Sequence, residues 1–351
     1  MNKKIFAERL SSARKMSGLS MDELVKKMHG KVSKNAISKY EKGLMLPNSS
    51  VAISLANALS VRVEYFFRES KFKLENFEFR KKTSKLSKKN QNSIVEKVRD
   101  FVERMYELEF LLNERQKFVN PLSKDPVLNL SDVEEKTLEL RKKWELGKDP
   151  ILNVVELLED VGIMVLELDE DESFDGISAK LNDVYVIAYN KNFDSVRKRF
   201  TVLHELAHLV LNFSSKLDEK SKETLCHAFA SAFLMPKEVF ENEFGKKRNN
   251  LTKQELIHLK EHFGASIQAI VYRAFNLNLI SSSSKDNFFK AWYRLGYRKK
   301  EPGKYKVDES PTKFNQLLQR AVAEEIISLS KSSDLANLSI QELTKKINII
   351  Q

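Results

Sequence analysis

Two histidines and a glutamate, His204, Glu205 and His208, stand together in a stretch of mainly apolar residues. The apolar residues around them recur at helical spacing without an intervening Pro or Gly, which predicts a helix. Positions four residues apart share one face of a helix, so His204 and His208 can direct two imidazoles to one metal ion. This H-E-x-x-H spacing is typical of zinc hydrolases, in which the histidines bind Zn²⁺ and the glutamate takes a proton from the water at the metal.

The next predicted helix offers candidates for a third ligand, because a catalytic zinc usually has three protein ligands and one water. Glu223, Cys226 and His227 stand at positions i, i+3 and i+4 and therefore share a face. We expect Glu223 to be the third ligand, with His227 behind it orienting a ligand. His227 is the alternative ligand, and Cys226 is a less favoured one because a lone cysteine is commonly a small buried hydrophobic residue.

These two stretches together resemble a known family. The motifs Arg199-Phe-Thr-x-x-His-Glu-Leu-Ala-His and Glu223-x-x-Cys-His-x-Phe-Ala-x-x-Phe-Leu-Met-Pro are similar to those of the ImmA/IrrE family of zinc metallopeptidases, over about residues 130–280. The resemblance implies Zn²⁺ as cofactor, Glu205 as the catalytic residue and Glu223 as the glutamate ligand. It places His227 at a variable polar position. Ala207 stands where many members have Gly, a change between small residues that leaves the ligands untouched.

The N-terminal part predicts a small helical domain. Residues 5–67 divide into five short apolar-striped segments, which indicates five helices. Ser20 and Glu23 have the spacing of a capping box at the start of the second helix. Ser33 precedes the third helix, expected over 34–41. The second and third helices, joined by a short connection, predict a helix-turn-helix.

The third helix carries a second family resemblance. The stretch from Ser33 to Gly43, followed by Pro47, resembles the Cro/repressor-like (XRE) DNA-binding family. The resemblance implies that double-stranded DNA is a partner and that residues early in this helix reach it, because Asn and Lys can bond base edges and phosphates. Those residues are Lys34, Asn35, Ser38 and Lys39. Met21 departs from the family, since many members carry there a Gln that contacts the DNA backbone.

Charge, cysteine content and hydropathy restrict the classes of function. The chain of 351 residues has a net charge of +11. Residues 1–100 hold 23 Lys/Arg against 10 Asp/Glu, whereas the remainder holds 37 against 39, so the positive charge lies N-terminally and favours a polyanionic partner there. A single cysteine excludes an intramolecular disulfide. We expect no membrane partner and a cytoplasmic location, because no apolar run of 18 residues appears.

The expected fold class is mainly α with a small β-sheet (α+β). We expect a five-helix helix-turn-helix head in residues 1–70, a basic linker and long helix in 71–125, a zincin-like metallopeptidase domain in 126–280 and a helical C-terminal extension in 281–351. The apolar stripe of the long helix, from Ile94 to Leu112, favours a dimer seam and hence a homodimer.

Several local elements complete this interpretation. Strands are expected at 162–169, 176–180 and 184–189, the last as a sheet edge that binds an extended substrate peptide. Ser131 and Glu134 predict a capping box, and the four serines of 281–284 predict a flexible break.

Two functions fit these observations. The first is a zinc-dependent endopeptidase fused to its own DNA-binding domain, which cleaves a regulatory protein such as a repressor. The second is a transcriptional regulator whose metal-binding domain senses a ligand or partner without proteolysis. Glu205 favours the first function, because a sensor does not need a general base beside its metal.

Overall fold

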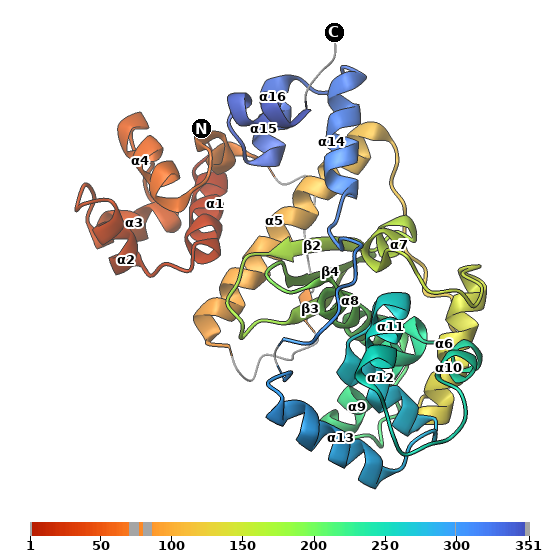
Figure 1. Ribbon diagram of the computed structural model, residues 1–351. Helices are drawn as coiled ribbons and strands as arrows, with labels where there is room; N and C mark the ends of the chain where they lie inside the picture. Colours follow the sequence, from red (N-terminus) through yellow and green to blue (C-terminus); the bar gives the residue numbers. More distant parts are fainter. Residues whose placement is uncertain (1, 70–76, 80–85, 299, 348–351) are drawn as a thin grey trace. The chain divides into compact units, whose positions relative to one another are not determined.

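The chain forms two compact units. The computed structural model describes residues 2–69, 77–79, 86–298 and 300–347. The first unit comprises Met1–Asn76, Lys82–Gln116 and Thr312–Gln351, and the second comprises Phe77–Lys81 and Lys117–Pro311. The fold is mainly helical with one small sheet, which confirms the expected class (Figure 1). Within the described ranges, no helix is both long and apolar enough to cross a membrane.

The N-terminal head of the first unit has the expected five elements: α1 (Lys3–Met16), α2 (Met21–Lys27), α3 (Lys34–Glu41), α4 (Ser49–Leu59) and the 3-10 helix η1 (Val63–Phe67). The apolar stripes of these helices meet in one core that includes Phe6, Leu24 and Ile37. The predicted capping box is present, since the Ser20 hydroxyl accepts from the Glu23 amide and the Glu23 carboxylate accepts from the Ser20 amide. This capping box fixes where α2 begins.

The long helix α5 (Lys88–Leu112) corrects the expectation of a dimer seam. Its apolar face, from Ile94 to Leu112, is buried inside the first unit, where α5 contacts α1 and α14 (Lys313–Ala323). Arg9 of α1 also pairs with Glu103 at 2.6 Å. An amphipathic stripe shows that a face is covered, and here the chain covers it with its own helices. Formation of a homodimer stays a prediction, but the buried face of α5 does not provide its seam.

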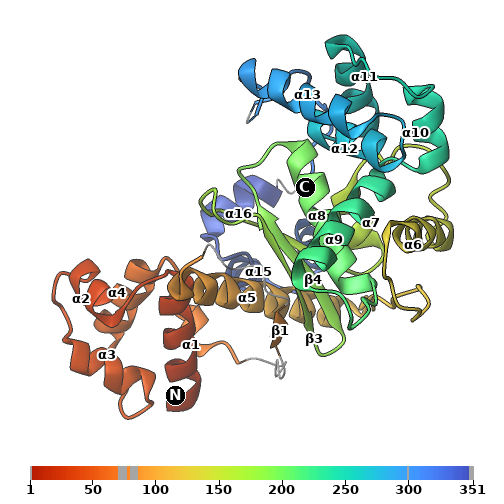
Figure 2. The same cartoon turned by 90° about the horizontal axis from the view of Figure 1, so that it is seen from below.

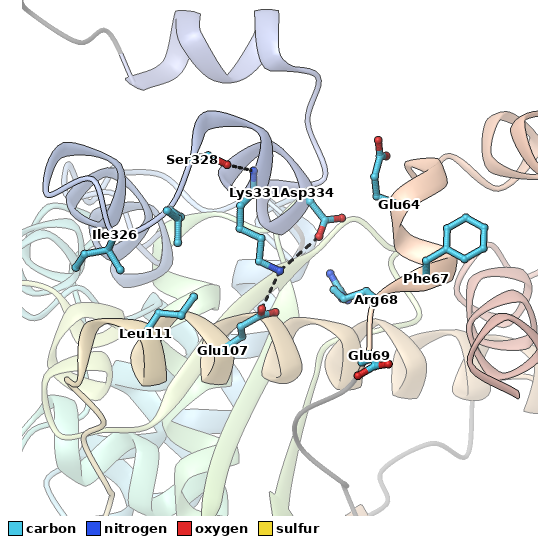
Figure 3. Close-up of a pocket in the computed structure, with 11 residues that line it drawn as sticks. Glu64, Phe67, Arg68, Glu69, Glu107, Leu111, Ile326, Ser328, Lys331 and Asp334 are labelled. Atoms are coloured by element: carbon cyan, nitrogen blue, oxygen red, sulfur yellow. Dashed lines mark hydrogen bonds and ion pairs between the residues drawn. The ribbon is translucent and has the colours of Figure 1, made fainter. Parts of the chain in front are cut away.

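The C-terminal helices α15 (Leu329–Ala336) and α16 (Ile340–Ile347) follow α14 in the same unit. An open cavity of about 620 Å³ lies among η1, α5 and α15. Figure 3 shows Lys331 beside it, pairing with Glu107 at 2.7 Å and with Asp334 at 3.8 Å. These ion pairs attach α15 to α5 and satisfy the charges at the cavity wall.

The second unit contains a four-stranded sheet in the order β1 (Phe77–Phe79), β3 (Gly176–Leu181), β4 (Val184–Asn190), β2 (Met164–Leu168). Strand β2 is parallel to β4, whereas β1 and β4 are antiparallel to β3. The expectation that residues 184–189 form a sheet edge is therefore wrong, because β4 is paired on both sides. Its nearly continuous burial suits a central strand, which is covered on both faces.

The helices of the second unit are α6 (Leu130–Lys143), α7 (Val154–Asp160), α8 (Ser195–Val210), α9 (Glu219–Leu234), α10 (Lys237–Phe244), α11 (Lys253–Phe263), α12 (Ile267–Asn276) and α13 (Ser282–Arg294). Helix α8 packs against β3, β4 and α9 (Figure 2). A core cluster that includes Leu203, Leu206 and Phe229 joins α8 and α9. This packing brings together the two helices that carry the candidate ligands.

Two local expectations in this unit are wrong. The capping box of α6 is formed by Asn129 and Asp132, not by Ser131 and Glu134, because the helix begins earlier and Asn129 caps it. The serines after position 280 are not a flexible break, since Ser281 caps α13 through the amide of Ser284.

Candidate metal centre and nucleic-acid interface

Helices α8 and α9 bring His204, His208 and Glu223 into mutual contact. The Nε2 atoms of the two histidines are 3.2 Å apart. One Glu223 carboxylate oxygen lies 3.3 Å from Nε2 of His204, and the other lies 3.3 Å from Nε2 of His208. Tetrahedral ligands about 2.0–2.1 Å from a zinc ion are separated from one another by about 3.3 Å. The spacing and the N/O donor set therefore fit a zinc ion.

The two other candidates lie on either side of this group. The ring of His227 is 4.5 Å from the ring of His204 and stacks on Phe200 at 5.8 Å. Cys226 is buried, with Sγ 3.5 Å from Nδ1 of His208, the nitrogen opposite the one that faces Glu223. Two overlapping sets, His204 with His208 and Cys226, and His204 with Glu223 and His227, also have ligand atoms within 4.8 Å of one another. The distances of 3.2–3.3 Å among His204, His208 and Glu223 match the separation of ligands on one ion, whereas 4.8 Å is only the upper bound for the two other sets.

Glu205 is held beside the histidines by a residue that the sequence did not indicate. The residue is 4% exposed, and its carboxylate accepts a 2.8 Å hydrogen bond from the hydroxyl of Ser178 on β3. A Cβ added to Gly176 would lie 2.7 Å from Thr201 and 3.3 Å from Cγ of Glu205, so glycine lets β3 approach α8 closely at this point. No local motif marks Ser178, because only the packing of the strand on the helix brings it to Glu205.

Helix α8 is anchored by a buried ion pair that also escaped the sequence analysis. Arg199 and Glu309 are both fully buried and pair at 2.5 Å. Arg199 further donates to carbonyls of Ile151, Leu152 and Gly264, and Glu309 accepts from the first amides of α7. This network fixes α8 one turn before His204. Residues 300–311 thus contribute to the position of the site, although their sequence shows no motif.

The predicted DNA-contact residues all lie on α3, the second helix of the helix-turn-helix. Lys34, Asn35 and Lys39 are exposed, and Ser38 is half-buried. Lys34 pairs with Asp22 of α2 at 2.7 Å. The opposite face of α3 is buried through Ile37 and Tyr40. Met21 packs against the core of the head, and its side chain is only partly exposed.

Comparison with known families agrees with both parts of this description. Residues 158–275 match the family model described as the IrrE N-terminal-like domain, a peptidase family, and residues 10–66 match a helix-turn-helix model. No curated protein matches the chain. The peptidase-family match implies a metal and a protein substrate, and the helix-turn-helix match implies DNA as a partner. The chain therefore joins a helix-turn-helix domain of the Cro/repressor-like type to an ImmA/IrrE-like peptidase-family domain.

Proposed function

We propose that this protein is a DNA-binding regulator with a zinc-dependent endopeptidase domain that cleaves a regulatory protein such as a repressor. The observation that carries the proposal is the spacing of 3.2–3.3 Å among His204, His208 and the carboxylate of Glu223. We assign these three residues as the zinc ligands. His227 supports His204 through ring contact and is the alternative ligand.

Glu205 is proposed as the general base and acid of the reaction. A bound zinc ion supplies a Lewis acid that polarises the scissile carbonyl and activates water. Glu205 accepts the proton of the attacking water and passes it to the nitrogen of the leaving amine. The hydrogen bond from Ser178 orients the carboxylate for this proton transfer. Burial of Glu205 keeps bulk water from competing for that proton.

The substrate peptide is proposed to lie along β3. Strand β3 carries Ser178 next to Glu205. It is paired with β4 on one side, and on the other side the described residues of β1 pair only with Ala179–Leu181, beyond Ser178. A peptide that adds to β3 as an extended strand would pass the site while its backbone is held by sheet hydrogen bonds. Strand β1 pairs with Ala179–Leu181 in this manner, which supports pairing of an extended segment on this side of β3, and a substrate strand would take the place of β1 there.

The head is proposed to bind double-stranded DNA through Lys34, Asn35, Ser38 and Lys39. Support comes from their position on α3, with the opposite face buried in the core. A head bound at an operator would raise the effective concentration of the peptidase toward a repressor on the same DNA. The two domains would then act on one target without a tight peptidase–substrate contact.

Co-expression with the products of flanking genes tests the proposal. We expect one of these proteins to be cleaved by the wild type and to stay intact with Glu205→Gln, while zinc content and DNA binding are unchanged. Glu219→Gln, which makes the same chemical change at an exposed carboxylate of α9, is the matched control and should cleave normally. If zinc regulates DNA binding and no protein is cleaved in a manner that depends on Glu205, the metal-sensing function replaces the peptidase function.

A further inference from the structure

A cavity of the peptidase-like unit lies next to the candidate metal centre and shares His227 with its surroundings. It has a volume of about 620 Å³, within the roughly 300–1,000 Å³ typical of ligand pockets. Phe200 of α8 and His227 of α9 line one end, and the ring of His227 lies 4.5 Å from that of His204. The cavity then runs between α9 and α12. His227 therefore adjoins both the cavity and His204 of the candidate metal centre.

The lining of this cavity has a consistent chemistry. Its walls combine aromatic and small apolar side chains with neutral polar ones, and none of the described lining residues is a Lys, Arg, Asp or Glu. The first group is Phe200, Ala228, Ala269, Tyr272 and Phe275, and the polar group is Thr224, His227, Ser231, Ser266, Gln268 and Asn276. Apolar walls favour an apolar occupant, because its transfer from water is favourable. Aromatic rings add edge and stacking contacts to an aromatic occupant. A charged occupant would lose its hydration without gaining an opposite charge.

One polar group of the lining has no partner. Ser231 of α9 is 5% exposed, and its hydroxyl makes no hydrogen bond to any described residue. A buried polar group without a partner is uncommon and costs stability. An occupant with a polar end would supply the missing partner. Ser231 stands one helical turn beyond His227 on the same face of α9, so it lies farther along the cavity from the metal centre.

We propose that this cavity is the specificity pocket of the peptidase and that it takes a neutral aromatic side chain of the substrate next to the scissile bond. Tyr is preferred over Phe, because its hydroxyl pairs with Ser231. The proposal rests on the zinc-peptidase function proposed above and adds the chemical class of substrate: peptides with an aromatic residue beside the cleaved bond.

Binding of hydroxamates tests the pocket without turnover. The probes are acetohydroxamate and a series of peptidyl hydroxamates that differ in one side chain next to the hydroxamate: Tyr, Phe, Ala, Glu or Lys. The zinc-loaded full chain is titrated with each by calorimetry. Burial of the ring should make the Tyr and Phe probes bind about 10–100-fold more tightly than the Ala probe. The Glu and Lys probes should bind no better than the Ala probe.

Two variants assign the preference to the pocket. Ala269→Phe fills the cavity from α12 and should abolish the preference for aromatic probes, with acetohydroxamate binding unchanged. Ala291→Phe, a partly buried alanine of α13 that does not line the cavity, is the matched control and should retain the preference. Ser231→Ala should remove the advantage of Tyr over Phe, whereas Ser221→Ala in the first turn of α9 should not.

The outcomes separate the pocket from the metal centre. If acetohydroxamate binds and all side-chain probes bind equally, the specificity pocket is overturned while the zinc centre stands. An aromatic preference that survives Ala269→Phe also overturns it, and a Tyr advantage that survives Ser231→Ala removes the role of Ser231. If no hydroxamate binds a zinc-loaded chain, the peptidase proposal fails, and the pocket proposal that rests on it fails with it.

Discussion

Replacement of Glu223 should release zinc far more readily than replacement of His227. The two carboxylate oxygens of Glu223 each lie 3.3 Å from Nε2 of a different ligand histidine, one from His204 and the other from His208. The ring of His227, by contrast, packs against that of His204 at 4.5 Å. Glu223→Ala therefore removes a ligand atom and the negative charge that balances the metal. His227→Ala removes a neighbour that orients a ligand.

The two losses can be compared by magnitude. Structural zinc sites bind with about 10–16 kcal/mol over four ligands, or about 3–4 kcal/mol for each ligand. Loss of one ligand then corresponds to a decrease in affinity of about 100–1,000-fold. Loss of a residue that only orients a ligand lowers the metal affinity by about 10-fold, the lower end of the usual range of about 10–100-fold. The affinities of the two variants should thus differ by about 10–100-fold.

Competition with a chromogenic zinc chelator at fixed pH measures both affinities. His258→Ala is the matched control, because His258 is an exposed histidine of α11 that stacks on His262 and has no contact with the centre. It should bind zinc as the wild type does. If His227→Ala loses as much affinity as Glu223→Ala, or more, then His227 is a ligand and the assignment from the 3.3 Å distances is refuted.

Three further predictions follow from other parts of the chain. Asn35→Ala should weaken binding to the cognate DNA site by about 1–3 kcal/mol and relax the sequence preference, whereas Lys39→Ala should weaken binding to all DNA sequences alike. Binding assays at several salt concentrations measure both effects. If neither variant changes DNA binding, α3 does not enter the groove. Burial raises the pKa of Glu109 to about 7 from 4.5, so its ionisation destabilises the fold increasingly as pH rises from about 4.5 to 7. Glu109→Gln should therefore raise the free energy of unfolding by up to about 3 kcal/mol at pH 8 and by little at pH 4, and an equal gain at both values would contradict the assigned cause. Glu78→Pro should weaken the pairing of β1 with β3 and increase cleavage of unfolded peptides, because proline lacks the strand N–H; an unchanged rate would argue against β3 as the substrate edge.

The sequence was sufficient where a property depends on neighbours within one helix. The spacing of His204 and His208 places them on one face, since a helix repeats every 3.6 residues whatever surrounds it. The capping box of Ser20 and Glu23 likewise closes within one turn.

Tertiary structure alone decided the features that join distant parts of the chain. The hydrogen bond from Ser178 to Glu205 crosses 27 residues, and the ion pair of Arg199 with Glu309 crosses 110. Neither pair has a sequence pattern, because any strand that packs on α8, or any loop that covers it, could supply the partner. The central position of β4 and the burial of the α5 stripe within the chain are of the same kind. An apolar pattern shows that a surface is covered, and only long-range packing determines which segment covers it.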